Sequence, residues 1–149
     1  MSLRKEGFVA IASVARADGL LRKDELNGLL GAARSVGLSE SEVGEVEHAL
    51  NEGVPLEQID FAGFSGAERV LTYALAHWLA TVDGIVNAQE LASLRELSTK
   101  LDLPEAKLKA AAAAAFDIVC LPGGNRPEKF QFAVLEARLR EKLPSLMSR

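Results

Sequence analysis

The spacing of apolar residues along the chain predicts helices. Apolar side chains recur every three to four residues in most segments, as at Phe8, Ile11, Ala12 and Ala15. This period places them on one face of an α-helix that packs against a core. No segment alternates apolar and polar residues over several positions, as a half-buried strand would. The pattern therefore predicts an all-α protein of about seven helices.

Polar residues mark where these helices begin and end. Three pairs have the spacing of a capping box: Ser39 with Glu42, Ser65 with Glu68, and Asn87 with Glu90. Glycine at Gly19 and Gly37 suits a helix end, because it adopts the left-handed conformation at little cost. We expect residues 53–64 to be irregular with one short turn after Pro55, a break over 121–127, and a last helix over about 128–143.

Part of the pattern occurs twice, with a constant offset of 65 residues. Eight residues recur without a gap: Ala15, Asp18, Gly19, Glu25, Leu26, Leu29, Leu38 and Glu40 return as Ala80, Asp83, Gly84, Glu90, Leu91, Leu94, Leu103 and Glu105. The repeats cover about 8–43 and 73–108, and each reads as a helix, an Asp-Gly corner and a second helix. We expect a pseudo-twofold axis to relate them within one domain spanning 1–149.

Composition is that of an ordinary folded protein, with 48% hydrophobic and 26% charged residues. No apolar run approaches 18 residues, so no transmembrane helix is expected. The N-terminus lacks a signal-peptide pattern and the single cysteine, Cys120, cannot form an internal disulfide, which suits the cytoplasm. The net charge of −4 argues against nucleic acid as a partner.

Acidic residues are concentrated in the segment between Arg34 and Arg69, which contains no Lys or Arg. Its acids are Glu40, Glu42, Glu45, Glu47, Glu52, Glu57, Asp60 and Glu68. The segment reads either as solvated helix faces or as an acidic docking surface for a basic partner or a cation. We find no catalytic set: His48 and His77 do not have zinc-ligand spacing with Cys120, and no serine has a base at motif distance. The sequence therefore predicts a protein that is not an enzyme.

The duplicated corner has the form Asp-Gly-x5-Glu, as in the second half of an EF-hand calcium loop. The first and third ligand positions of such a loop would fall on Val14 and Arg16, and on Leu79 and Thr81, so EF-hand binding is not expected. One interpretation is structural: the aspartate caps the corner and the glutamate is stabilised by the helix dipole. The other is that four carboxylates converge on a divalent hard cation. Its candidate metal ligands are Asp18, Glu25, Asp83 and Glu90.

The two segments Ala17–Leu26 and Val82–Leu91 resemble the signature of the TerB-like tellurite-resistance family, as does the later repeat of Leu38-Ser39-Glu40 by Leu103-Pro104-Glu105. The resemblance implies an all-helical fold of about seven helices in the cytoplasm. It also implies a role in the stress response to tellurite, with charged surfaces, partner proteins of a stress-response system and possible metal binding. The acidic signature falls on the four residues named above. The first copy departs from the pattern at the cap position, where it has Arg22 and the second copy has Asn87.

Two functional hypotheses follow. The first is a non-enzymatic TerB-like module that binds partner proteins or a ligand through charged surfaces. The second is a protein that binds or senses a divalent hard cation through its two acidic corners. Neither requires an organic cofactor, and the oligomeric state is left open.

Overall fold

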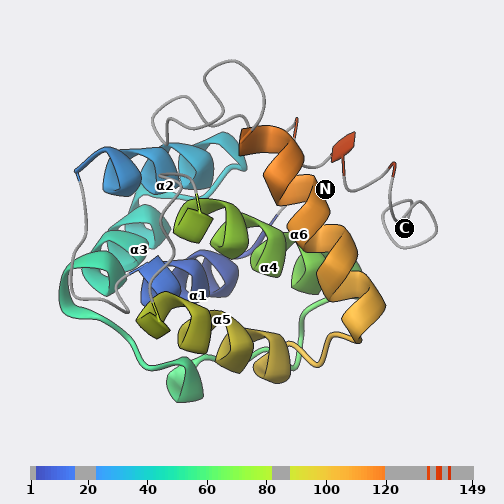
Figure 1. Cartoon of the computed structure of the whole chain (residues 1–149). Helices are drawn as coiled ribbons and strands as arrows, with labels where there is room; N and C mark the ends of the chain where they lie inside the picture. The colour runs from blue at the N-terminus through green and yellow to red at the C-terminus, as the bar shows by residue number, and fades with distance from the viewer. Residues whose placement is uncertain are drawn as a thin grey trace.

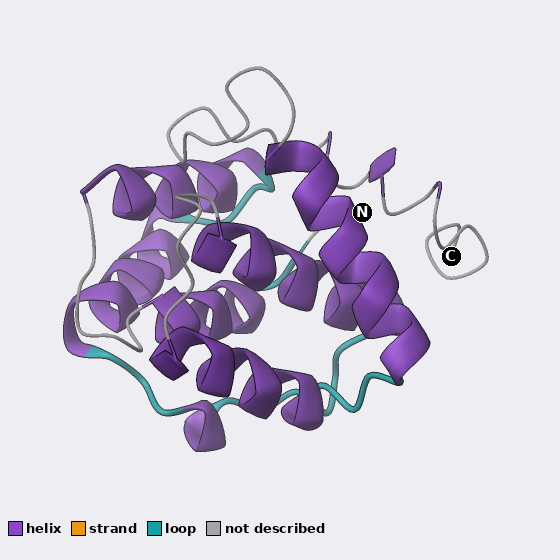
Figure 2. Cartoon of the chain, viewed as in Figure 1, coloured by secondary structure: helices purple, strands orange, loops and turns teal. Residues whose placement is uncertain are grey.

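The computed structural model describes residues 3–15, 23–81 and 88–119, together with positions 134, 137, 138 and 141. The chain forms α1 (Lys5–Ala15), α2 (Lys23–Ser35), α3 (Glu40–Glu52), the 3₁₀ turn η1 (Leu56–Gln58), α4 (Gly66–Thr81), α5 (Ala88–Lys100) and α6 (Glu105–Val119). The described part contains six α-helices and no strand, which confirms the all-α prediction (Figure 2). The expected helix over 128–143 lies outside the described residues except at those four positions, where the backbone is helical.

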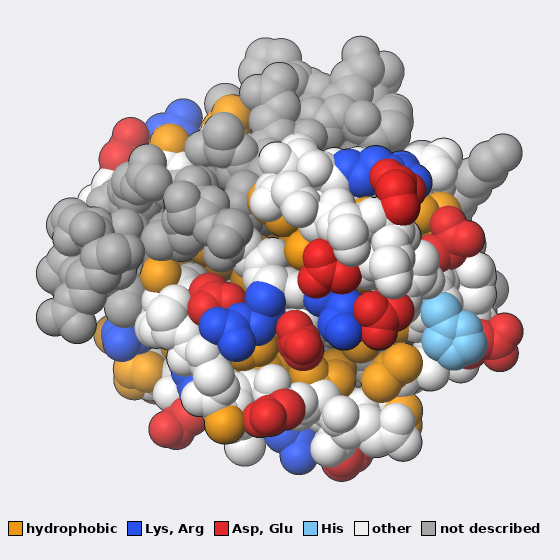
Figure 3. Space-filling model, turned by 180° about the vertical axis from the view of Figure 1, so that it is seen from behind, with side chains coloured by type: hydrophobic (Ala, Val, Ile, Leu, Met, Phe, Trp, Pro, Cys, Tyr) orange, Lys and Arg blue, Asp and Glu red, His pale blue; other side chains and the backbone are white. Residues whose placement is uncertain are grey.

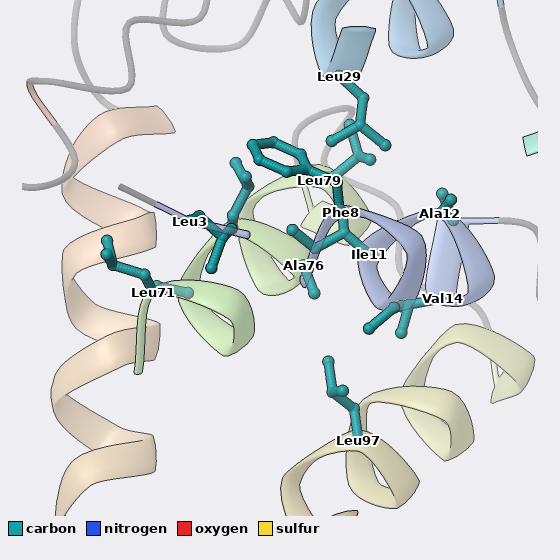
Figure 4. Close-up of a cluster of buried hydrophobic side chains, with 14 of the residues drawn as sticks. Leu3, Phe8, Ile11, Ala12, Val14, Leu29, Leu71, Ala76, Leu79 and Leu97 are labelled. Atoms are coloured by element: carbon teal, nitrogen blue, oxygen red, sulfur yellow. The ribbon is translucent and has the colours of Figure 1, made fainter. Parts of the chain in front are cut away.

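Helices α1 and α4 lie at the centre of the bundle (Figure 1). Helix α1 packs against α3, α4 and α5, whereas α4 packs against α1, α5 and α6. Both are apolar on most of their surface: Phe8 and Ile11 of α1 and Leu71 of α4 are fully buried. Figure 4 shows these side chains meeting Leu97 of α5 and Leu29 of α2 in one cluster. The long apolar faces that the sequence predicts thus form a single core.

Helix α6 packs closely on α4 because its inner face is made of alanine. Ala111, Ala114 and Ala115 are all buried. Side chains this small let two helix backbones approach closely, and alanine also has the highest helix propensity. The buried alanines of the run over 110–115 therefore form a packing face against α4.

The internal repeat is visible in the boundaries of the helices. Helix α2 covers 23–35 and α5 covers 88–100, so both ends are displaced by 65 positions. Helices α3 and α6 start at 40 and 105, with the same displacement. The contacts correspond in part: α4 packs on α6 as α1 packs on α3, and α4 on α5 as α1 on α2. The pseudo-twofold relation between the halves stays a prediction.

The predicted caps are present where the structure describes them. The Ser39 Oγ accepts the Glu42 amide at 3.1 Å, and the Glu42 carboxylate accepts the Ser39 amide at 3.0 Å. Ser65 and Glu68 make the same reciprocal pair at 3.1 and 3.2 Å. The third expected pair, Asn87 with Glu90, lies outside the described residues and side chains. The short turn expected after Pro55 is η1.

One apolar position of α5 lies off its buried face. Leu91 is 46% exposed, whereas Leu94, Leu97 and Leu101 are buried. The reason is rotation: each residue advances a helix by about 100°, so Leu91 lies roughly 90° from the middle of the face formed by the other three. Residues spaced by three positions throughout do not stay on one face of a helix with 3.6 residues per turn, whereas spacings that alternate between three and four do.

Candidate functional site

Of the four predicted metal ligands, the structure describes the backbone of two and the side chain of none. Asp18 and Asp83 lie outside the described residues. Glu25 and Glu90 each stand third in their helices, in the first turns of α2 and α5, while their side chains lie outside the described part. A carboxylate in the first turn is stabilised by the positive end of the helix dipole, as the structural interpretation of the corner requires.

The helices that flank the two corners end on the same side of the molecule. In Figure 1 the C-terminal ends of α1 and α4 and the N-terminal ends of α2 and α5 all point to the left. Helix α1 packs directly against α2, α4 and α5, so these helices form one group rather than two separate hairpins. Two N-terminal helix ends favour negative charge there, and two C-terminal ends present backbone carbonyl oxygens. We call this side, bounded by Ala15, Lys23, Thr81 and Ala88, the corner end.

A shallow hollow lies next to the last turns of α1. Its volume is about 370 Å³, and its lining includes Ser13 of α1 and Glu52 at the end of α3. The segment Gly53, Val54 and Pro55 completes it. Among the described residues, the hollow presents the hydroxyl of Ser13 and the exposed carboxylate of Glu52.

Many acids of the segment between Arg34 and Arg69 have structural roles. Glu42 and Glu68 complete capping boxes, and the Asp60 carboxylate accepts the Ala62 amide at 2.9 Å. Glu40 lies 3.4 Å from Arg34, and Glu45 lies 3.1 Å from the Lys5 ammonium. Figure 3, which shows the molecule from behind, has acidic and basic side chains interspersed on that side. These contacts give several of the acids a structural role, and the docking interpretation of the segment stays a prediction.

Two carboxylates nevertheless approach each other between η1 and α5. The pKa of Glu57 is lowered by its own backbone amide and by a hydrogen bond with Glu96. The pKa of Glu96 is raised by burial and by the same contact with Glu57. Of the two carboxylates, Glu96 therefore binds a proton more readily than Glu57. Lys100 lies close enough to favour the charged form of both groups.

Two arginines organise the junction between the halves, and the sequence reasoning missed both. Arg4 donates to Glu68 through Nε and Nη2, each at 2.7 Å, and to the Gly63 carbonyl at 2.8 Å. Its guanidinium carbon lies 5.0 Å from the centre of the Phe64 ring. The two hydrogen bonds from the Arg4 guanidinium keep the pKa of the Glu68 carboxyl below its ordinary value. The signal available in the sequence was weak, because the partners stand about 60 residues apart.

Arg69 binds three backbone carbonyls from two segments. Its guanidinium donates to the Leu101 oxygen at 2.7 Å, the Phe61 oxygen at 2.9 Å and the Phe64 oxygen at 3.3 Å. It thereby ties the linker between the repeats to the C-terminal end of α5, where a cation is favoured by the helix dipole. It is a positioning residue for the fold.

The histidines show no metal-site arrangement. His48 is exposed on α3, and His77 is half-buried with its ring 6.0 Å from that of Tyr73. Burial lowers the pKa of His77, so its imidazole is neutral at pH 7. Cys120 lies outside the described residues. In the part of the chain that the structure describes, no three His, Cys, Asp or Glu residues form a group able to hold a metal.

No helix among the described residues is both long and apolar enough to cross a membrane. Comparison of the chain with models of known protein families, with curated proteins and with solved structures gives no match.

Proposed function

We propose that the chain is a non-enzymatic binding module of the TerB-like, stress-response type, and that its corner end is the part that binds. One observation carries this proposal: the flanking helices of both Asp-Gly-x5-Glu motifs end on the same side of the molecule (Figure 1). Two bends with the same acidic signature on one side can act on a single ligand. The proposed partners are other proteins of a cytoplasmic stress-response system, or a small ligand.

The second candidate is a divalent hard cation at the same end. Asp18, Glu25, Asp83 and Glu90 would supply carboxylate oxygens, and the last turns of α1 and α4 would add carbonyl oxygens. Oxygen ligands of this kind suit Ca²⁺, Mg²⁺ and Mn²⁺. The helix dipoles at the starts of α2 and α5 oppose a bare cation, so the carboxylates must outweigh them. The shared side of the helix ends that flank the two motifs is again the supporting observation.

Calorimetric titration separates the two candidates. We would titrate Ca²⁺, Mg²⁺ and Mn²⁺ into the wild-type chain, the variant Glu25→Gln/Glu90→Gln, and the matched control Glu45→Gln/Glu47→Gln. The control removes the same charge from exposed positions on α3. Heats that disappear only in the first variant support the cation site. If the wild-type chain gives no heat of binding with any of the three cations, the cation site is excluded and the protein-binding module remains the proposed function.

A pull-down from lysate at low and high salt tests the module itself. Loss of a salt-sensitive partner in the Glu25→Gln/Glu90→Gln variant, with retention in the α3 control, supports binding at the corner end. Loss in the α3 control alone would move the binding surface to the acidic face of α3. Partners indifferent to salt and to both variants would contradict binding through charged surfaces.

A further inference from the structure

We draw no further inference here: the strongest candidate, the outward face of α6 where Phe116 is 63% exposed, carries none because a Glu105–Lys109 ion pair interrupts it and nothing in the structure shows what covers it.

Discussion

Gly37 and Asp102 stand 65 positions apart and close their helices with the same backbone geometry. Both have positive φ, 92° at Gly37 and 53° at Asp102. In the first half the Leu38 amide donates to the Ala33 oxygen; in the second, the Leu103 amide donates to the Ser98 oxygen, each at 3.3 Å. The amides of Gly37 and Asp102 donate three residues back, to the carbonyls of Arg34 and Thr99. Both ends are therefore Schellman motifs, one with the favoured glycine and one without.

This pair predicts opposite effects for opposite substitutions. Gly37→Ala should lower the free energy of unfolding by about 1 kcal/mol, because a Cβ is strained at this φ although nothing lies within 4 Å of it. Asp102→Gly should raise it by roughly 0.5 kcal/mol, the relief of strain being offset in part by the greater entropy of glycine in the unfolded chain. Urea unfolding followed by circular dichroism measures both.

The control is a glycine-to-alanine substitution at an ordinary helical position. Gly44 lies on the solvent face of α3. A Cβ added there would have no side chain or other segment within 4 Å, and the residue does not have positive φ. Gly44→Ala should stabilise the protein by up to about 1 kcal/mol, since alanine has the higher helix propensity. An equal loss at Gly37 and Gly44 would show that the left-handed cap is not the cause.

Acid should weaken the contact between the N-terminal residues and α4. The pKa of Glu68 lies below its ordinary value of 4.5, chiefly through the hydrogen bonds from Arg4. The unfolded chain therefore binds this proton more readily, so the contribution of Glu68 is complete above pH 4.5 and is lost as the pH falls through the lowered folded-state pKa. Since the Arg4 side chain is 42% exposed, we expect about 1 kcal/mol or less.

Urea unfolding between pH 7 and 3 tests this. The variant Glu68→Gln should be less stable at pH 7 and lose less stability on acidification than the wild type. Glu45→Gln is the matched control, because the Glu45 side chain that pairs with Lys5 is 55% exposed, against 13% for Glu68, and its loss should change stability little. Parallel pH profiles for the wild type and Glu68→Gln would count against the ionic contact.

Close packing of α1 on α4 should make Gly7 intolerant of a side chain. A Cβ at this position would lie 2.8 Å from Leu3 Cδ1 and 3.0 Å from Thr72 Oγ1. The Thr72 hydroxyl is held by its hydrogen bond to the Glu68 carbonyl, so it yields less easily than the leucine. We expect Gly7→Ala to lower the free energy of unfolding by about 1 to 2 kcal/mol, despite the gain in helix propensity.

A double-mutant cycle identifies the cause. Leu3→Ala empties the space above Gly7, so Gly7→Ala should cost less in the Leu3→Ala background than in the wild type. Thermal unfolding of the four proteins gives the coupling free energy. A coupling of zero would place the clash at Thr72 alone.

Removing the Arg69 fork should detach the linker from α5. Arg69→Met retains much of the apolar stem but removes the guanidinium donor from three partly buried carbonyls, of which that of Phe61 keeps a backbone donor, the Phe64 amide. We expect a loss of roughly 2 kcal/mol. Arg69→Lys should restore only part of this, because one ammonium cannot reproduce the planar fork. The control Arg95→Met, at an exposed position of α5, should be nearly neutral. Hydrogen exchange in residues 59–64 locates the effect.

Local order was predictable from the sequence alone. The capping boxes at Ser39 and Ser65 and the helix end at Gly37 were expected and are present. Each depends on interactions between residues three to five positions apart, which the order of amino acids along the chain specifies directly. The candidate ligands Asp18, Glu25, Asp83 and Glu90 also came from the sequence, through their repeated spacing, and stay a prediction.

Tertiary structure decided what joins distant segments. Only the folded chain brings Arg4 to Glu68 and Arg69 to Leu101, because the local helical pattern does not pair side chains that far apart in the sequence. It also left Leu91 exposed and engaged Glu40 and Glu45 with cations from other helices, since which face of a helix is covered depends on its neighbours. The common side of the helix ends that flank the two corners arises in the same way, from the packing of α1 on α4 and α5.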